Sequence, residues 1–221
     1  MEFDAGLRRR APWERSDGGP ARAVGVLLCA LIALCPARAA AEGKALEVGD
    51  AVPDLSAVDI DGDPVRTASY RDWVVVLSFA DRDSSEAMKA WMGGAQVRAT
   101  KSHPTLRVAY LSFADLSAVP GFLRGMVRPL LRRSFERSNE DLAKSYRDAG
   151  IEPEPSKVTF RFVPDWDGSH LETFGIEDAG SYRVWIAVGG RVVAALDGAT
   201  PDVAERYVEA FDRIARPEGG P

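Results

Sequence analysis

The sequence predicts an α/β protein: a three-layer α/β/α sandwich with a mixed central sheet and an N-terminal β-hairpin. Two strand-like segments, the apolar and β-branched run Trp73–Phe79 and the run Leu106–Phe113, flank a helical pattern. Strands that alternate with helices pair in parallel and are covered on both faces. Near the C-terminus, Arg183–Val188 and Arg191–Leu196 are joined by two glycines, which is typical of a tight hairpin. This hairpin should add an antiparallel edge.

The first half of the chain begins with the N-terminal hairpin. Leu55–Ile60 alternates in polarity, the turn signal Asp61-Gly62-Asp63 follows, and Val65–Thr67 returns. A helix is expected from about Ser84, after the first central strand, and Gly93-Gly94 should weaken its end. Its apolar face would consist of Ala87, Met88, Trp91 and Ala95.

In the second half, Pro120–Ala149 has helical character, contains Pro129 and is closed by Gly150. Two helices and one kinked helix fit this stretch equally well. Val158–Val163 predicts a third strand, and the turn-rich segment Asp165–Gly180 has room for one helical turn. Thr200-Pro201 would start the last helix as N-cap and first residue. The apolar face of that helix consists of Val203, Tyr207, Val208, Phe211 and Ile214.

Residues 1–41 have the pattern of a secretory signal peptide. Arginines precede the 13-residue apolar run Ala23–Cys35, and small residues follow, so that cleavage is expected after Ala39 or Ala41. The run is shorter than the roughly 20 residues that span a bilayer. An uncleaved N-terminal anchor is the alternative. The expected organisation is a signal peptide over 1–41, one domain over 42–216 and a disordered tail over 217–221, in a periplasmic or secreted protein.

Cleavage would remove the only two cysteines, Cys29 and Cys35. The mature chain could then form no disulfide and would contain no thiolate ligand or sulfur nucleophile. Its net charge would be −7, because six of the 28 basic and four of the 33 acidic residues lie in the leader. Such a surface repels nucleic acid and anionic lipid at long range, so a nucleic-acid partner is not expected. No stable membrane span is expected in the mature form.

Several segments resemble the redoxin branch of the thioredoxin-like superfamily, which includes peroxiredoxins of the alkyl hydroperoxide reductase/thiol-specific antioxidant type and exported thiol–disulfide proteins. They are the lead-in Val48–Leu55, the hairpin Asp59–Val65, Tyr70-Arg71 before the core strand Val74–Ala80, and the closing strand–glycine–strand Tyr182–Leu196. The resemblance covers about Leu46–Ile214. It implies a thioredoxin-like fold.

The resemblance also shows which parts of a thiol site are lacking. Alignment on Phe79 places the family's C-x-x-C pair at Ser84 and Ala87, so that Ser84, Ser85, Glu86 and Ala87 form a degenerate active-site turn. The family's cis-proline would precede the next strand, where the chain reads Asp178–Tyr182 without proline. Thiol exchange and peroxide reduction both need a thiolate. Redox catalysis should therefore be lost, with no catalytic residue and no cofactor expected.

Other chemistry has little support in the sequence. A serine nucleophile needs an oriented base, and the chain has only His103 and His170 and no G-x-S-x-G elbow. Ser84 is better explained as the helix N-cap. Asp59–Asp63 and Asp165–Gly168 resemble fragments of calcium loops, but turn formation accounts for both. The two histidines do not have zinc-site spacing, so no metal is expected.

Arg124, Arg128 and Arg132 recur every four residues, with Arg133 and Arg137 nearby. They are either a solvated face paired with Glu136, Glu140 and Asp141, or a surface that docks an acidic partner or a membrane headgroup. Trp166, in a polar turn, should be the most exposed tryptophan. The candidate partner-binding residues are therefore Arg124, Arg128, Arg132, Trp166, Ser181 and Tyr182.

The sequence thus favours a redox-inactive module that binds a protein or peptide of the cell envelope. The groove beside Phe79–Glu86 and the Ser181–Tyr182 loop would be the surface used, because peptides lie there in the family that the chain resembles. The alternative is a redoxin-type antioxidant or thiol–disulfide oxidoreductase, which would need a retained leader or a site shared with a partner. A serine hydrolase is a third alternative.

Overall fold

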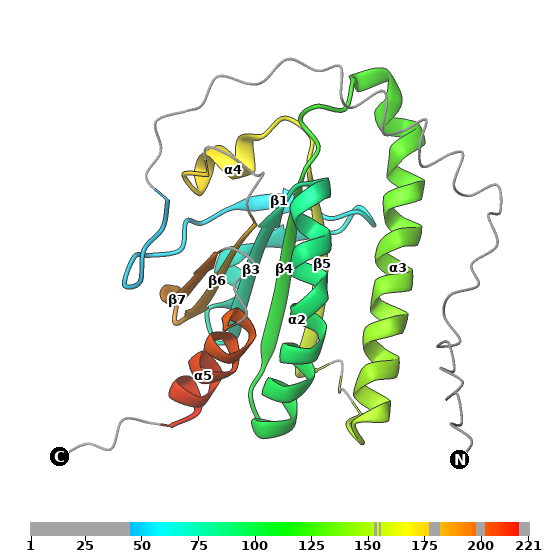
Figure 1. Cartoon of the computed structure of the whole chain (residues 1–221). Coiled ribbons are helices and arrows are strands. Elements are labelled where there is room, and N and C mark those ends of the chain that lie inside the picture. The colour runs from blue at the N-terminus through cyan, green and yellow to red at the C-terminus, as the bar shows by residue number, and fades with distance from the viewer. Residues whose placement is uncertain (1–44, 153, 155, 177–181, 198–201, 217–221) are drawn as a thin grey trace, which may run out of the picture. The chain divides into compact units, whose positions relative to one another are not determined.

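A computed structural model describes residues 45–216 except 153, 155, 177–181 and 198–201 (Figure 1). The predicted leader and tail lie outside these residues. The centre is a five-stranded mixed sheet with strand order β5-β4-β3-β6-β7, and a separate two-stranded hairpin precedes it. The predicted fold class is confirmed.

The sheet is built around β3 (Val74–Ala80), in which every residue is buried. It pairs in parallel with β4 (Val108–Asp115), which pairs in parallel with β5 (Val158–Asp165). On its other side, β3 pairs antiparallel with β6 (Arg183–Val188), and β6 with β7 (Arg191–Asp197). Alternate residues of β3 enter hydrophobic clusters on the two faces of the sheet, which explains why its sequence is continuously apolar.

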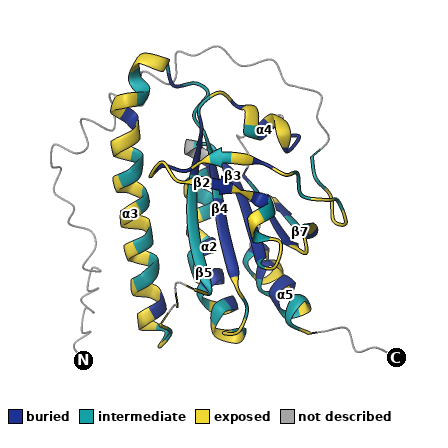
Figure 2. Ribbon diagram, turned by 180° about the vertical axis from the view of Figure 1, so that it is seen from behind, coloured by how far each residue is buried: buried dark blue, intermediate teal, exposed yellow. Residues whose placement is uncertain are grey.

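One face of the sheet is covered by α2 (Arg82–Ser102) and α5 (Val203–Ala215), with α3 (Arg124–Asp148) near the β5 edge (Figures 1 and 2). Val203, Tyr207 and Phe211 are buried, which confirms the predicted apolar face of α5. Thr200 and Pro201, its predicted N-terminus, lie outside the described residues. The α2 and α5 helices are also joined by Arg98–Glu205 and by His103–Asp212.

The opposite face is covered by the hairpin of β1 (Ser56–Val58) and β2 (Pro64–Arg66) and by two short helices, η2 (Thr67–Tyr70) and α4 (Ser169–Thr173). An aromatic cluster lies beneath this layer, in which Phe79 stacks on Phe113 with ring centroids 4.5 Å apart. The other two members of the cluster are Phe174 and Trp185.

Two helix predictions are corrected. The α2 helix does not end at Gly93-Gly94 but continues to Ser102, because Ala95 and Ala99 beyond them are buried in the core. Packing of an apolar face outweighs a cost of about 1 kcal/mol per glycine. The Pro120–Ala149 region is a short 3-10 turn, η3 (Gly121–Leu123), followed by the single helix α3. Pro129 lies within its second turn and does not divide it.

Candidate functional site

The turn between β3 and α2 is held by a capping box. The N-cap is Asp81, whose carboxylate Oδ1 accepts a hydrogen bond of 2.7 Å from the Ser84 backbone N–H. In return, the Asp81 N–H donates to Ser84 Oγ at 3.0 Å, and the Ser84 hydroxyl donates to Asp81 Oδ1 at 2.7 Å. The prediction that Ser84 is the N-cap is therefore wrong by three residues, because the helix begins at Arg82 and Ser84 occupies its third position.

This arrangement makes Ser84 a structural residue. Its side chain is only 7 % exposed, and the hydroxyl both donates to and accepts from Asp81. Among the described residues, neither histidine supplies a base to it. His103 follows the opposite end of α2, roughly 28 Å away at 1.5 Å per residue, and its Nε2 lies 2.6 Å from Asp212. Within the part of the chain that the structure describes, Ser84 thus lacks the histidine base of a serine nucleophile.

His170 is the second histidine and lies in α4. Its ring meets Phe113 edge-on with centroids 5.9 Å apart, and its backbone N–H donates to Asp165. The side chain is half-buried. It supports the turn and has no contact with Ser84 among those that the structure describes.

Replacing Ser84 by alanine tests the structural role. The change removes the two hydrogen bonds of the Ser84 hydroxyl and keeps the bond from the backbone N–H to Asp81, so we expect a loss of about 1 kcal/mol in unfolding free energy, measured by urea denaturation. Ser138→Ala is the matched control, because Ser138 is an exposed serine within α3 whose hydroxyl bonds only to the Ser134 carbonyl. That change should alter stability by less than about 0.5 kcal/mol. Equal stability of the two variants would contradict the role assigned to Ser84.

The rest of the degenerate turn is unevenly exposed. Glu86 is exposed and pairs with Lys89 at 2.9 Å, Ser85 is half-buried, and Ala87 packs against the core. Tyr182 is only 2 % exposed, and its hydroxyl accepts a 3.0 Å hydrogen bond from Trp91 Nε1. Ser181 and the rest of the segment where the family's proline is missing lie outside the described residues. Tyr182 thus packs between the sheet and α2, while Ser85 and Glu86 lie on the outer side of the turn.

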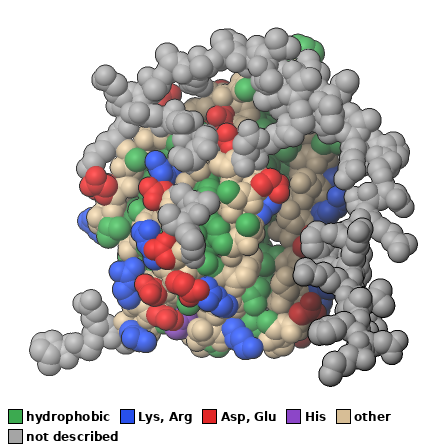
Figure 3. All heavy atoms as spheres, viewed as in Figure 1, with side chains coloured by type: hydrophobic (Ala, Val, Ile, Leu, Met, Phe, Trp, Pro, Cys, Tyr) green, Lys and Arg blue, Asp and Glu red, His purple; other side chains and the backbone are tan. Residues whose placement is uncertain are grey.

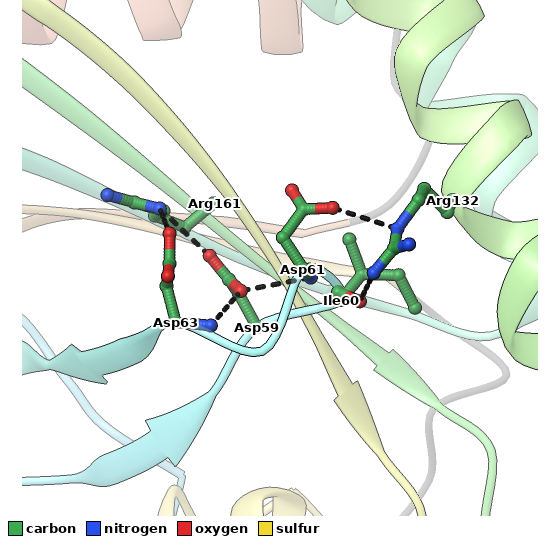
Figure 4. Close-up of polar contacts among 6 residues, drawn as sticks. All are labelled: Asp59, Ile60, Asp61, Asp63, Arg132 and Arg161. Carbon is green, nitrogen blue, oxygen red and sulfur yellow. Dashed lines mark hydrogen bonds and ion pairs between the residues drawn. The ribbon is translucent and has the colours of Figure 1, made fainter.

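The Asp59–Asp63 segment forms the tip of the hairpin (Figure 4). The Asp59 carboxylate is 2 % exposed and accepts backbone N–H bonds from Asp61 and Asp63. Its second oxygen lies 2.9 Å from Arg161 Nη1. These acids are therefore used in a turn, as predicted, and the described residues contain no group of three metal-ligating side chains.

The predicted arginine stripe is divided by the structure. Arg132 forms an ion pair with Asp61 at 2.9 Å and donates to the Ile60 carbonyl, which joins α3 to the hairpin (Figure 4). Arg124 donates to the Trp166 carbonyl at 2.7 Å and lies 5.8 Å from the centre of the half-buried Trp166 ring. Arg128 is exposed. Two of the three arginines therefore stabilise the tertiary structure, through partners 71 and 42 positions away.

Sequence reasoning missed the capping role of Asp81 and the ion pair of Asp61. Asp81 carries a usable signal, because aspartate is a preferred N-cap residue. Asp61 carries no local signal, because its partner Arg132 comes from a distant helix.

The described residues form one open groove, of about 520 Å³, between β7 and α5. It is lined by both charge signs, including Arg206, Arg213, Glu209 and Asp212, and Figure 3 shows basic and acidic side chains interspersed around α5. A smaller cavity of about 20 Å³ lies beside η2. Neither is at the α2 turn. Within the described residues, no helix is long and apolar enough to cross a membrane.

The sheet order and the capped helix after its central strand define a thioredoxin-fold protein. No protein-family model and no curated protein matches the sequence. The chain is 17% identical to a protein proposed to be a disulfide isomerase from Bacteroides thetaiotaomicron, with a TM-score of 0.50 over 78% of this chain and 92% of that chain. This likeness shows the fold, in agreement with the resemblance in the sequence.

Two further solved structures are similar at lower scores. Peroxidoxin BcpB from Mycobacterium tuberculosis is 15% identical, with a TM-score of 0.48 over 77% of this chain and 99% of that chain. A proposed thiol:disulfide interchange protein DsbE from Chlorobium tepidum is 15% identical, with a TM-score of 0.46 over 76% and 98% of the two chains.

Proposed function

We propose that this protein is a redox-inactive thioredoxin-fold module that binds a protein or peptide in the cell envelope. One observation carries the proposal: the helix start that would hold the reactive thiols in a C-x-x-C protein holds Ser84 and Ala87, and both side chains are used in the structure. An alcohol bound into a capping box can neither act as a thiolate nor close a disulfide.

Export is part of the proposal and is supported by the basic, apolar and small-residue pattern of residues 1–41. It matters for chemistry because the sequence contains no cysteine after Cys35. The alternative, a redoxin-type oxidoreductase, is favoured by the fold it shares with the proposed disulfide isomerase. It would require Cys29 or Cys35 to remain in the working protein.

The binding surface that we propose is the outward side of the α2 turn and the loop that leads into β6. Glu86 contributes an exposed carboxylate there and Ser85 a half-buried hydroxyl, at the positive end of the α2 dipole. Trp166 and Arg128 are the other candidate contacts. Tyr182 is bonded to α2 through Trp91, whereas Arg124 and Arg132 join α3 to Trp166 and to the hairpin tip.

Redox assays test the central claim. Purified full-length protein should neither reduce insulin disulfides nor consume hydroperoxide above the uncatalysed rate, because both reactions need a thiolate. Thioredoxin and a peroxiredoxin serve as positive controls. A Cys29→Ser/Cys35→Ser variant should behave like the wild type. Turnover by the wild type that this variant lacks would establish the oxidoreductase alternative.

The binding surface is tested by site-specific photocrosslinking. A benzoylphenylalanine at Glu86 should crosslink to envelope polypeptides, and the same group at Lys101, exposed near the other end of α2, should not. Crosslinking must be competed by an excess of the unlabelled protein. Equal crosslinking from both positions would locate binding elsewhere and contradict the surface proposed.

A further inference from the structure

The η3 turn and the N-terminal end of α3 carry an apolar stripe that the other described residues leave uncovered. Phe122 is 83 % exposed, Met126 65 % and Leu130 37 %, and they follow one another at intervals of four residues. Side chains four apart on a helix lie on one face, one turn above the other. Figure 2 shows much of this helix exposed. Three large apolar side chains in a row at one point of the surface are unusual for a protein that keeps this face in water.

The same region is strongly basic. Residues 116–135 contain four arginines and no acidic residue. Arg124 and Arg132 are bound within the chain, which leaves Arg128 and Arg133, and Arg137 follows one turn later. All three are exposed, and no hydrogen bond or ion pair engages them among the described residues. Arg133 and Arg137 come seven residues after Met126 and Leu130, so they continue the apolar stripe along the same face.

The start of the helix adds to this positive potential. No acidic residue lies in the first turn of α3, and no side chain caps its N-terminus at Leu123. The positive end of the helix dipole is therefore not compensated by a local carboxylate. The first acidic residue of α3 is Glu136, roughly 18 Å along the helix axis from Arg124 at 1.5 Å per residue. Over its first three turns the helix therefore adds no negative charge to this tip.

We propose that Phe122, Met126 and Leu130, together with Arg133 and Arg137, form a docking element for an anionic lipid surface. The apolar side chains enter the boundary between headgroups and acyl chains, and the guanidinium groups stay at the level of the phosphates. The stripe projects from a helix surface instead of lining a cavity, and neither cavity described includes any of these residues. A projecting apolar tip with a basic collar fits a soft, flat, anionic surface. The inference does not depend on the proposed function.

Vesicle binding by the full-length protein tests the proposal. Phe122→Ser/Met126→Ser and Arg133→Gln/Arg137→Gln are compared with the wild type on phosphatidylcholine vesicles with and without phosphatidylglycerol. Loss of two surface arginines should weaken binding to the anionic vesicles about 30-fold, and loss of the two apolar anchors at least about tenfold. The matched controls are Val48→Ser/Val58→Ser, which removes exposed apolar groups elsewhere, and Lys144→Gln/Arg147→Gln at the other end of α3. They should bind like the wild type.

Photocrosslinking at Phe122 reports lipid contact made by this element itself. It is not affected by lipid contact made by residues 1–44, which every variant contains. Benzoylphenylalanine at Phe122 should form a lipid adduct, detected by mass, with anionic vesicles, and the same group at Val58 should not. Vesicle-bound protein without a lipid adduct at Phe122 would overturn the proposal. An adduct of twice the protein mass would also overturn it, because it would show that a second copy of the chain covers the stripe.

Discussion

Replacing Phe79 by alanine should lower the free energy of unfolding by about 3 to 5 kcal/mol, the largest effect that we expect of a single substitution. The ring is 1 % exposed and lies at the centre of the aromatic cluster. It stacks on Phe113 at 4.5 Å and meets Trp185 at 5.4 Å and Phe174 at 4.7 Å. Truncation leaves a cavity that these three rigid rings cannot fill.

Urea denaturation of the two proteins measures this difference. Phe122→Ala is the matched control, because it truncates the same side chain where it is 83 % exposed and should change stability by less than about 0.5 kcal/mol. A cost below about 1 kcal/mol for Phe79→Ala would mean that the cluster is not packed as described.

Replacing Asp165 by alanine should cost about 3 kcal/mol. Its carboxylate is 0 % exposed and accepts the backbone N–H groups of Gly168, His170 and Leu171 at 2.9 to 3.0 Å, which fixes the turn from β5 into α4. Alanine leaves these donors without their acceptor in a buried place, and each such loss costs about 1 to 3 kcal/mol. Asp72→Ala is the control, since Asp72 is exposed and lies outside this turn. Its loss should cost less than about 1 kcal/mol.

Asp165 also makes a specific contribution to the dependence of stability on pH. Burial raises the pKa of its carboxyl above the ordinary value of 3.8, and the N–H bonds from Leu171 and Gly168 oppose that rise. The native state therefore binds the proton more tightly than the unfolded state. The contribution of this group to stability is largest below the unfolded pKa and decreases as pH rises through the native pKa.

The stability difference between wild type and Asp165→Asn should thus be largest at acid pH and decrease above about pH 4. Denaturation curves measured across this range check the sign. A difference that increases with pH would mean that the N–H bonds outweigh burial and hold the pKa low.

Several elements of the fold could be read from local sequence. Val74–Ala80 is buried at every position, so its apolar run could be recognised as a central strand. The closing hairpin turns at Gly189 and Gly190, both with positive φ, which glycine adopts without strain. The helix boundaries were less accurate, because the cap of α2 is set by a reciprocal contact between Asp81 and Ser84.

The candidate site was predicted in part. The absence of sulfur from the α2 turn is a property of the sequence. The capping role of Ser84, however, depends on where the helix begins. Likewise, the spacing of Arg124, Arg128 and Arg132 placed them along one helix. It did not reveal that Arg124 donates to the Trp166 carbonyl, or that Arg132 donates to the Ile60 carbonyl at the hairpin tip.

The sequence by itself determined the order of strands and helices and the lack of any thiol beyond residue 35, because periodicity and residue chemistry are local properties. Only the tertiary structure decided which arginines are bound and which are free, and which apolar side chains of α3 remain in water. Those outcomes depend on contacts between segments far apart in the chain, which local patterns do not encode.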